Sequence, residues 1–112
     1  MDSIQAKNVN HPEYREPLKR AKYRHIRDAI LGVLSAEDGR ELTFDELEQG
    51  VHAHFKKNPV PDELFPKPGS VRWYTKAVQL DLEARGALER IPGRSPLALR
   101  LTPDAGTLDL EP

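Results

Sequence analysis

The 112-residue sequence predicts a single α+β domain, mainly α, in which three amphipathic helices are followed by a C-terminal β-hairpin. Apolar residues recur at helical spacing in three separate segments, and clusters rich in proline or glycine separate these segments. A last turn cluster lies between two short apolar runs of strand type. The length suits one domain with its own core and is too short for two.

The first element expected is an extended N-terminal arm over residues 1–15, where no sustained period is found. Pro17 suits the first turn of a helix, because the backbone N–H that proline lacks is not needed there. The helix that follows carries apolar residues at helical spacing, namely Tyr23, Ile26, Ile30, Val33 and Leu34. Asp38 and Gly39 form a turn signal that ends it.

A second helix is expected after a stub of strand at residues 40–42. Thr43 lies three residues before Glu46, which is the spacing of a capping box at a helix N-terminus. The buried stripe of this helix is expected to consist of Phe44, Leu47, Val51 and Phe55. Asn58 precedes Pro59 and is pushed out of helical geometry, so the helix ends there and an irregular connection follows over residues 58–69.

A third helix is expected from an N-cap at Ser70 to about Arg85, with Gly86 as its stop. Residues 87–91 and 97–101 then form a hairpin around the turn cluster at residues 92–96. The domain thus covers residues 16–102, and residues 103–112 form an acidic flexible tail.

The order helix, strand stub, helix, helix and hairpin is that of a winged helix-turn-helix: three helices plus a two- to three-stranded C-terminal wing hairpin. The segments WYTKAVQLDLEARG (residues 73–86), AKY (21–23) and LFP (64–66) resemble a small uncharacterised bacterial winged-helix family, over about residues 8–101. More broadly, the chain is similar to winged helix-turn-helix transcription regulators. The resemblance implies the fold and carries over no activity.

On a helical wheel the third helix has two apolar strips and one polar arc. The first strip holds Trp73, Ala77, Leu80 and Ala84, and the second holds Val71, Tyr74, Val78 and Leu82. The polar arc holds Arg72, Thr75, Lys76, Gln79 and Glu83. Trp73 is expected in the core, where replacement by Ala would cost ~3–5 kcal/mol. Asp81, between the strips, is expected to be partly buried and paired with Arg85 or Arg27.

The polar arc has the donors and acceptors that read the DNA major groove, so the nucleic-acid-binding residues are expected to be Arg72, Thr75, Lys76, Gln79 and Arg94. Arg94, at the tip of the wing between Arg90 and Arg100, suits phosphate contact. The sequence therefore predicts a protein that binds double-stranded DNA, acts in transcription regulation and forms a homodimer on paired half-sites.

The charge distribution leaves a second interpretation open. Residues 1–36 and 65–102 carry net charges of +3 and +4, whereas residues 37–64 carry −5 and the whole chain −1. One basic face results if the two basic blocks share a side. A mixed or apolar patch around Tyr74 and Tyr14 would instead favour a protein-protein interaction module without nucleic-acid binding.

The sequence lacks the residue patterns of metal sites, catalytic sites and membrane segments. The absence of cysteine excludes thiolate metal centres and cysteine nucleophiles, and His52 and His54 fall on different helix faces, so neither a metal site nor a cofactor is expected. No nucleophile motif or pair of catalytic carboxylates is present, and an enzyme is not expected. No apolar run spans a bilayer and the N-terminus lacks a signal peptide, so a cytoplasmic protein without membrane contact is expected.

Overall fold

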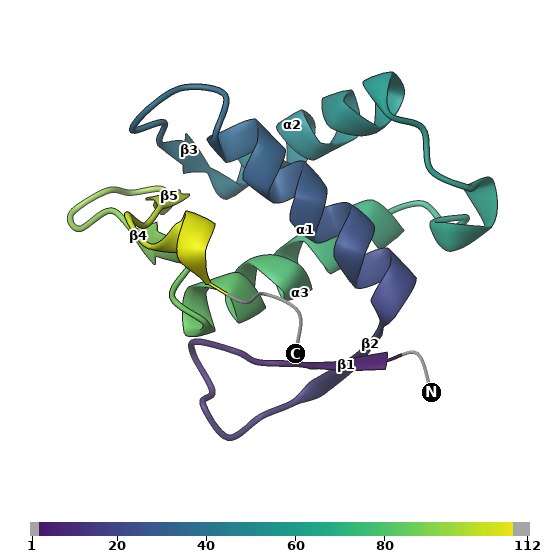
Figure 1. The fold of residues 1–112 in the computed structure, drawn as a ribbon, viewed down its shortest axis with the longest axis horizontal. Coiled ribbons are helices and arrows are strands. Elements are labelled where there is room, and N and C mark those ends of the chain that lie inside the picture. Colours follow the sequence, from purple (N-terminus) through teal and green to yellow (C-terminus); the bar gives the residue numbers. More distant parts are fainter. Residues whose placement is uncertain (1–2, 109–112) are drawn as a thin grey trace.

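The computed structural model describes residues 3–108 as an α+β arrangement of three helices and two small antiparallel sheets (Figure 1). The helices are α1 (Arg20–Leu34), α2 (Phe44–Lys57) and α3 (Ser70–Ala84). The strands are β1 (Ser3–Ala6), β2 (Glu16–Lys19), β3 (Leu42–Thr43), β4 (Leu88–Arg90) and β5 (Ala98–Leu101). Two short 3₁₀ helices, η1 (Asp62–Leu64) and η2 (Ala105–Thr107), complete the list. The predicted fold class is confirmed at this level. Helices α2 and α3 have nearly their predicted bounds, whereas α1 begins at Arg20 and ends at Leu34, short of the predicted turn at Asp38 and Gly39.

The N-terminal segment is a β-hairpin and not a simple arm. Strand β1 pairs antiparallel with β2, with Ile4 opposite Leu18. Both of these side chains and Ala6 are buried, and the hairpin packs against α1 and α3. Pro17 therefore lies in β2 and α1 begins only at Arg20, so the predicted helix start is wrong. The reason is tertiary: strands this short become recognisable only through their partner.

Helices α1 and α2 bury the faces that their periodicity predicts. Thr43 and Glu46 form the predicted capping box: the Thr43 backbone N–H donates to Glu46 at 2.9 Å, and the Glu46 backbone N–H donates to Thr43 Oγ1 at 3.2 Å. The two helices approach closely at Gly50, where an added Cβ would lie 2.6 Å from Val33 Cγ1. Asn58 ends α2 as predicted.

Helix α3 lies between two glycines with positive φ, Gly69 at its start and Gly86 after its end. The predicted N-cap, Ser70, is instead the first helical residue, because Gly69 adopts the left-handed conformation at φ 82°. The Ser70 hydroxyl caps nothing and is buried without a hydrogen-bond partner among residues 3–108.

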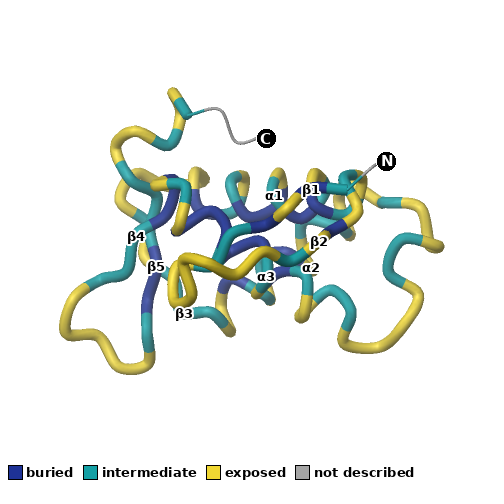
Figure 2. Tube along the Cα trace, turned by 90° about the horizontal axis from the view of Figure 1, so that it is seen from below, coloured by how far each residue is buried: buried dark blue, intermediate teal, exposed yellow. Residues whose placement is uncertain are grey.

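The C-terminal strands form a three-stranded antiparallel sheet in the order β3-β5-β4. The stub β3 pairs with β5 through Leu42 and Leu99, and β4 pairs with β5 through Leu88 and Leu101. In Figure 2 the loop between β4 and β5 and the loop of the N-terminal hairpin are exposed, whereas the helices are buried along their inner faces.

The predicted flexible tail, residues 103–112, is described only as far as residue 108. Ala105 and Leu108 are partly buried and pack against the core. Residues 109–112 lie outside the described part of the chain, as do residues 1 and 2 of the predicted arm.

Candidate interaction face on the third helix

Helix α3 is turned about its axis relative to the sequence prediction. Its buried residues are Thr75, Val78, Gln79, Asp81, Leu82 and Glu83. Thr75 and Gln79 are both 0% exposed, so their predicted place on the exposed arc is wrong, and in this conformation neither reaches a surface ligand. Trp73, predicted in the core, is 51% exposed.

The buried side of α3 includes polar side chains, and these are hydrogen-bonded to other groups of the chain. Thr75 Oγ1 donates to the Val71 carbonyl at 2.7 Å. Gln79 Nε2 donates to Glu83 at 2.6 Å, and Gln79 Oε1 accepts from Lys76 Nζ at 3.3 Å. The Glu83 carboxylate also accepts from Arg90 on β4. A buried polar group costs little free energy once it is hydrogen-bonded, so this face can be internal.

Asp81 on the same helix holds the N-terminal hairpin in place. Its carboxylate is fully buried and accepts from Arg85 Nε at 2.8 and 2.9 Å, which confirms the predicted pairing with Arg85. It also accepts from the Lys7 backbone N–H at 2.7 Å and from the Tyr23 hydroxyl. Burial and the hydrogen bond to Asp81 raise the pKa of Tyr23. Asp81 thus ties the exit of β1, helix α1 and the end of α3 together.

Arg72, at the start of α3, faces acids of α2, whereas Lys76 lies over an aromatic ring of that helix. The Arg72 side chain is 54% exposed and donates to Asp45 at 3.1 Å and also to Glu48. These hydrogen bonds raise the pKa of Arg72. Lys76 is exposed, and its ammonium lies 4.4 Å from the centroid of the Phe44 ring, over which the Arg72 guanidinium lies at 4.9 Å. Partial burial lowers the pKa of Lys76.

The arginines of the hairpin formed by β4 and β5 are also paired with acids. Arg94, in the loop between β4 and β5, is 46% exposed and donates to Glu41 at 3.3 Å. Arg100 lies 3.6 Å from Glu41 and donates to Glu89 at 2.6 Å. Of the five predicted residues, the structure brings together Arg72 and Lys76 over the Phe44 ring, leaves Arg94 in the loop between β4 and β5, and buries Thr75 and Gln79.

Sequence reasoning missed the acidic partners of these arginines, Asp45, Glu48 and Glu41. A signal for them existed in the net charge of −5 over residues 37–64. In space, acids of this block lie beside Arg72, Arg94 and Arg100, so the positive charges of these three side chains are locally offset.

The outer face of α3 presents an apolar row in place of the expected polar arc. Trp73, Ala77, Leu80 and Ala84 recur with spacings of four, three and four residues, and we call this row the α3 strip. The Trp73 and Ala84 side chains are exposed, whereas those between them are partly buried. Trp73 also packs edge-on against Tyr74, with the ring centroids 5.1 Å apart.

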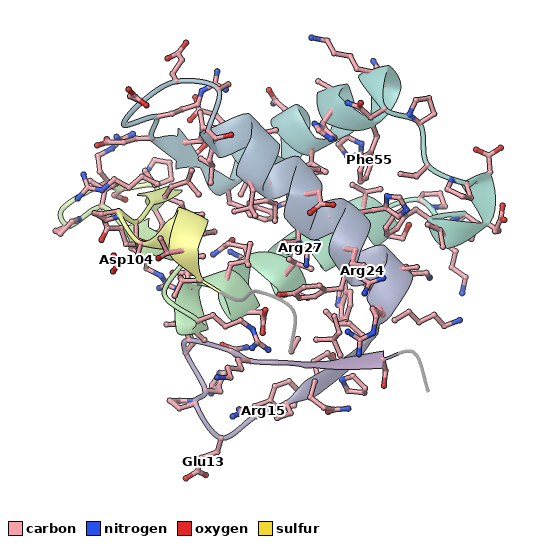
Figure 3. The ribbon with its side chains drawn as sticks, in the orientation of Figure 1. Glu13, Arg15, Arg24, Arg27, Phe55 and Asp104 are labelled. Carbon is pink, nitrogen blue, oxygen red and sulfur yellow. The ribbon has the colours of Figure 1, made fainter. Side chains whose placement is uncertain are left out.

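The N-terminal hairpin flanks the α3 strip and makes two hollows beside it. A groove of about 160 Å³ lies between Trp73 and Leu80 on one side and Tyr14 on the other. Tyr14 is 50% exposed, and its neighbour Glu16 raises its pKa. Figure 3 shows the hairpin loop, with Glu13 and Arg15 labelled, at the lower edge of the molecule.

The second hollow, of about 310 Å³, lies at the other end of the α3 strip. Its lining includes Ala84 from α3 and, from the hairpin loop, Val9, Pro12 and Arg15. Val9 is 37% exposed and apolar. Arg15 donates to the carbonyls of Pro12 and Tyr14 at 2.8 and 2.9 Å, which fixes its guanidinium at the loop.

Within residues 3–108, no group of three or more His, Cys, Asp or Glu side chains is placed to hold a metal ion. Among the same residues, no helix has the length and apolar character to cross a membrane.

The comparisons with known proteins identify a family. Residues 3–99 match the model of a family of unknown function, DUF6958, and the chain belongs to this family. No curated protein and no solved structure matches the chain.

Proposed function

We propose that this member of DUF6958 is a winged-helix protein that binds another protein through the outer face of α3, and that it does not bind double-stranded DNA with that face. The order α1, β3, α2, α3, β4, β5 and the sheet order β3-β5-β4 support a winged helix, in which the loop between β4 and β5 is the wing. A winged-helix fold does not by itself indicate whether the partner is a protein or DNA, so the proposal depends on the surface of α3.

The observation that carries the proposal is the exposed indole of Trp73 at the head of the α3 strip, beside the exposed ring of Tyr14. Tryptophan and tyrosine are enriched at protein interfaces and among the residues that contribute most to binding. Neither ring is needed to fill the core, which is made by other residues of α3, such as Val78 and Leu82.

The surface charges also favour a protein partner over DNA. A DNA-binding helix offers its cations to phosphates, and each such contact releases counterions. Here Arg72 and Arg94 already have carboxylate partners, so a phosphate would have to displace Asp45, Glu48 or Glu41. A DNA duplex would also meet the repulsion of these acids.

Sequence-independent binding of DNA is the second candidate, and Lys76 is the observation that favours it. Lys76 is exposed at the middle of α3, and residues 3–108 give its ammonium no carboxylate partner within salt-bridge distance. Helix α3 is also the element that a winged helix places in the major groove. In such a complex, DNA phosphates would have to replace the carboxylates that now pair with Arg72 and Arg94.

Photocross-linking in the living cell would test the proposed function. A photoreactive phenylalanine analogue replaces Tyr14, and the control carries the analogue at Ala53, which is exposed on α2 on a different part of the surface. We expect the Tyr14 position to yield protein adducts of defined mass that the Ala53 position lacks.

Two outcomes would contradict the proposal. Adducts with nucleic acid at the Tyr14 position would favour the second candidate. Equal labelling at the two positions would show that the face of α3 has no particular partner.

A further inference from the structure

We infer that the α3 face docks on a second copy of this chain, with the two α3 helices antiparallel and related by a two-fold axis. This inference rests on the proposed function and specifies its partner. It comes from the order of large and small side chains along the α3 strip and from the hollow at its end.

The spacing of the α3 strip is that of a seam between two helices. Apolar residues that alternate at intervals of four and three keep one line of contact along a helix, as in coiled coils. In this strip the large residues Trp73 and Leu80 alternate with the small residues Ala77 and Ala84. A second helix can therefore approach closely at the alanines while its own large side chains fill the space above them.

The strip is complementary to itself when it is reversed. An antiparallel copy whose two-fold axis passes between Val78 and Gln79 places Trp73 opposite Ala84 of the other copy, and Ala77 opposite Leu80. Every large residue then meets a small one, at all four positions of the strip. A parallel alignment would oppose Trp73 to Trp73 and Leu80 to Leu80, and would lose this fit.

The hollow at the end of the strip is where the indole of the second copy would arrive. Ala84 forms part of its wall, with Val9 and Pro12 from the hairpin loop as apolar neighbours. Arg15 also lines it, and a guanidinium beside an indole face is a favourable cation–π contact. Each copy thus presents one exposed indole and one hollow, as an isologous dimer requires.

The single tryptophan of the chain makes the test direct. We expect the full chain to double in mass with rising concentration in sedimentation equilibrium. We also expect the Trp73 emission maximum to move to shorter wavelength over the same concentration range, because the indole leaves water.

Ala84→Lys is the decisive variant. It fills the hollow and adds a charge beside Arg15, but it lies eleven residues from Trp73, or roughly 16 Å along the same helix. We expect it to weaken self-association by about tenfold or more and to keep the Trp73 emission that of an exposed indole. Ala53→Lys, at an exposed site near the end of α2, is the matched control and should dimerise as the parent does.

Complementation by mixing tests the antiparallel alignment. Trp73→Ala keeps the hollow and lacks the indole, whereas Ala84→Lys keeps the indole and lacks the hollow. Each variant alone has lost both contacts of the symmetric dimer, but a mixed pair retains one. The equimolar mixture should therefore dimerise more tightly than either variant alone, with a shift of the Trp73 emission to shorter wavelength.

Three results would overturn the inference: a chain that is monomeric at every concentration, a dimer that Ala84→Lys leaves intact, or no complementation in the mixture. A monomeric chain whose Tyr14 position still cross-links to a different protein would refute the second copy and leave the proposed function standing. A monomeric chain without such adducts would refute both.

Discussion

Helices α2 and α3 are of similar length and lie side by side, yet they differ in the kind of residue that they bury. Helix α2 buries Leu47 and Val51 and leaves Asp45 and Glu46 exposed, as its periodicity predicts. Helix α3 buries Thr75, Gln79 and Glu83 and leaves the Trp73 side chain half-exposed. A single apolar stripe determines how a helix faces the core, whereas two adjacent stripes leave the choice to contacts from elsewhere in the fold.

Those contacts come from other elements of the fold. Arg90 on β4 partners Glu83, and the Lys7 backbone and Tyr23 partner Asp81. Once these polar groups are satisfied, the inner face of α3 is determined and the α3 strip remains outside. Four substitution experiments test this comparison, in order of decreasing expected effect.

The largest effect is expected from the buried carboxylate of α3. Asp81→Ala leaves the Arg85 guanidinium, which is 11% exposed, and the Tyr23 hydroxyl without their partner. Removing one member of a buried ion pair costs about 3–5 kcal/mol of unfolding free energy. Urea denaturation at fixed protein concentration measures this cost.

The control for Asp81 is an acid of α2. Asp45→Ala removes a partner of Arg72. The Arg72 and Asp45 side chains are 54% and 76% exposed, so the loss should be no more than about 1 kcal/mol, as for exposed ion pairs. Equal losses for Asp81→Ala and Asp45→Ala would show that the carboxylate of Asp81 is not buried.

The next effect separates the two apolar strips of α3. Leu82→Ala empties a fully buried site and should cost about 2–5 kcal/mol. Trp73→Ala removes a larger side chain that is half exposed, and it should cost about 1 kcal/mol or less at concentrations where the chain is monomeric. If Trp73→Ala is the more costly of the two, the orientation of α3 described above is wrong.

A smaller effect tests the close approach of α1 to α2. An alanine Cβ at Gly50 would lie 2.6 Å from Val33 Cγ1, and valine is stiff in a helix. We therefore expect Gly50→Ala to destabilise by about 1–3 kcal/mol in thermal or urea unfolding.

Gly32 in α1 is the matched control for Gly50. The nearest atom to an added Cβ there is 3.4 Å away, in the His54 ring. Gly32→Ala should be neutral or stabilising by up to about 1 kcal/mol, because alanine is the better helix former. A neutral Gly50→Ala would mean that the two helices are farther apart than the structure places them.

Much of the fold can be predicted from local signals. The capping box at Thr43 and Glu46, the stop at Asn58 and the C-terminal hairpin each depend on residues near in sequence, and the structure confirms them. The hairpin of β1 and β2 could not be predicted in this way, because four-residue strands are defined only by their partner. The same holds for the N-cap of α3, where the conformation of Gly69 determines the start of the helix.

The candidate site was less predictable for a related reason. The wheel placed Arg72 and Lys76 on an outer face, and both are exposed. It could not show that Gln79 and Thr75 would be buried, because the orientation of α3 depends on contacts with other elements, such as that of Glu83, the partner of Gln79, with Arg90 of β4. Nor could it show that Asp45 and Glu48 would lie beside Arg72. The acidic composition of their segment did indicate that carboxylates could compete with DNA phosphates for the arginines.

The smallest expected effect tests the proposal that the α3 face binds protein and not DNA. The test uses Lys76, an exposed cation of this face that has no carboxylate partner within residues 3–108. The measurement is a fluorescence-anisotropy titration of random double-stranded DNA with the parent chain and with Lys76→Glu, from low to physiological salt. We expect no salt-dependent binding at micromolar protein and no difference between the two chains. Binding that weakens steeply with salt, with a slope that falls by about one ion in Lys76→Glu, would contradict the proposal.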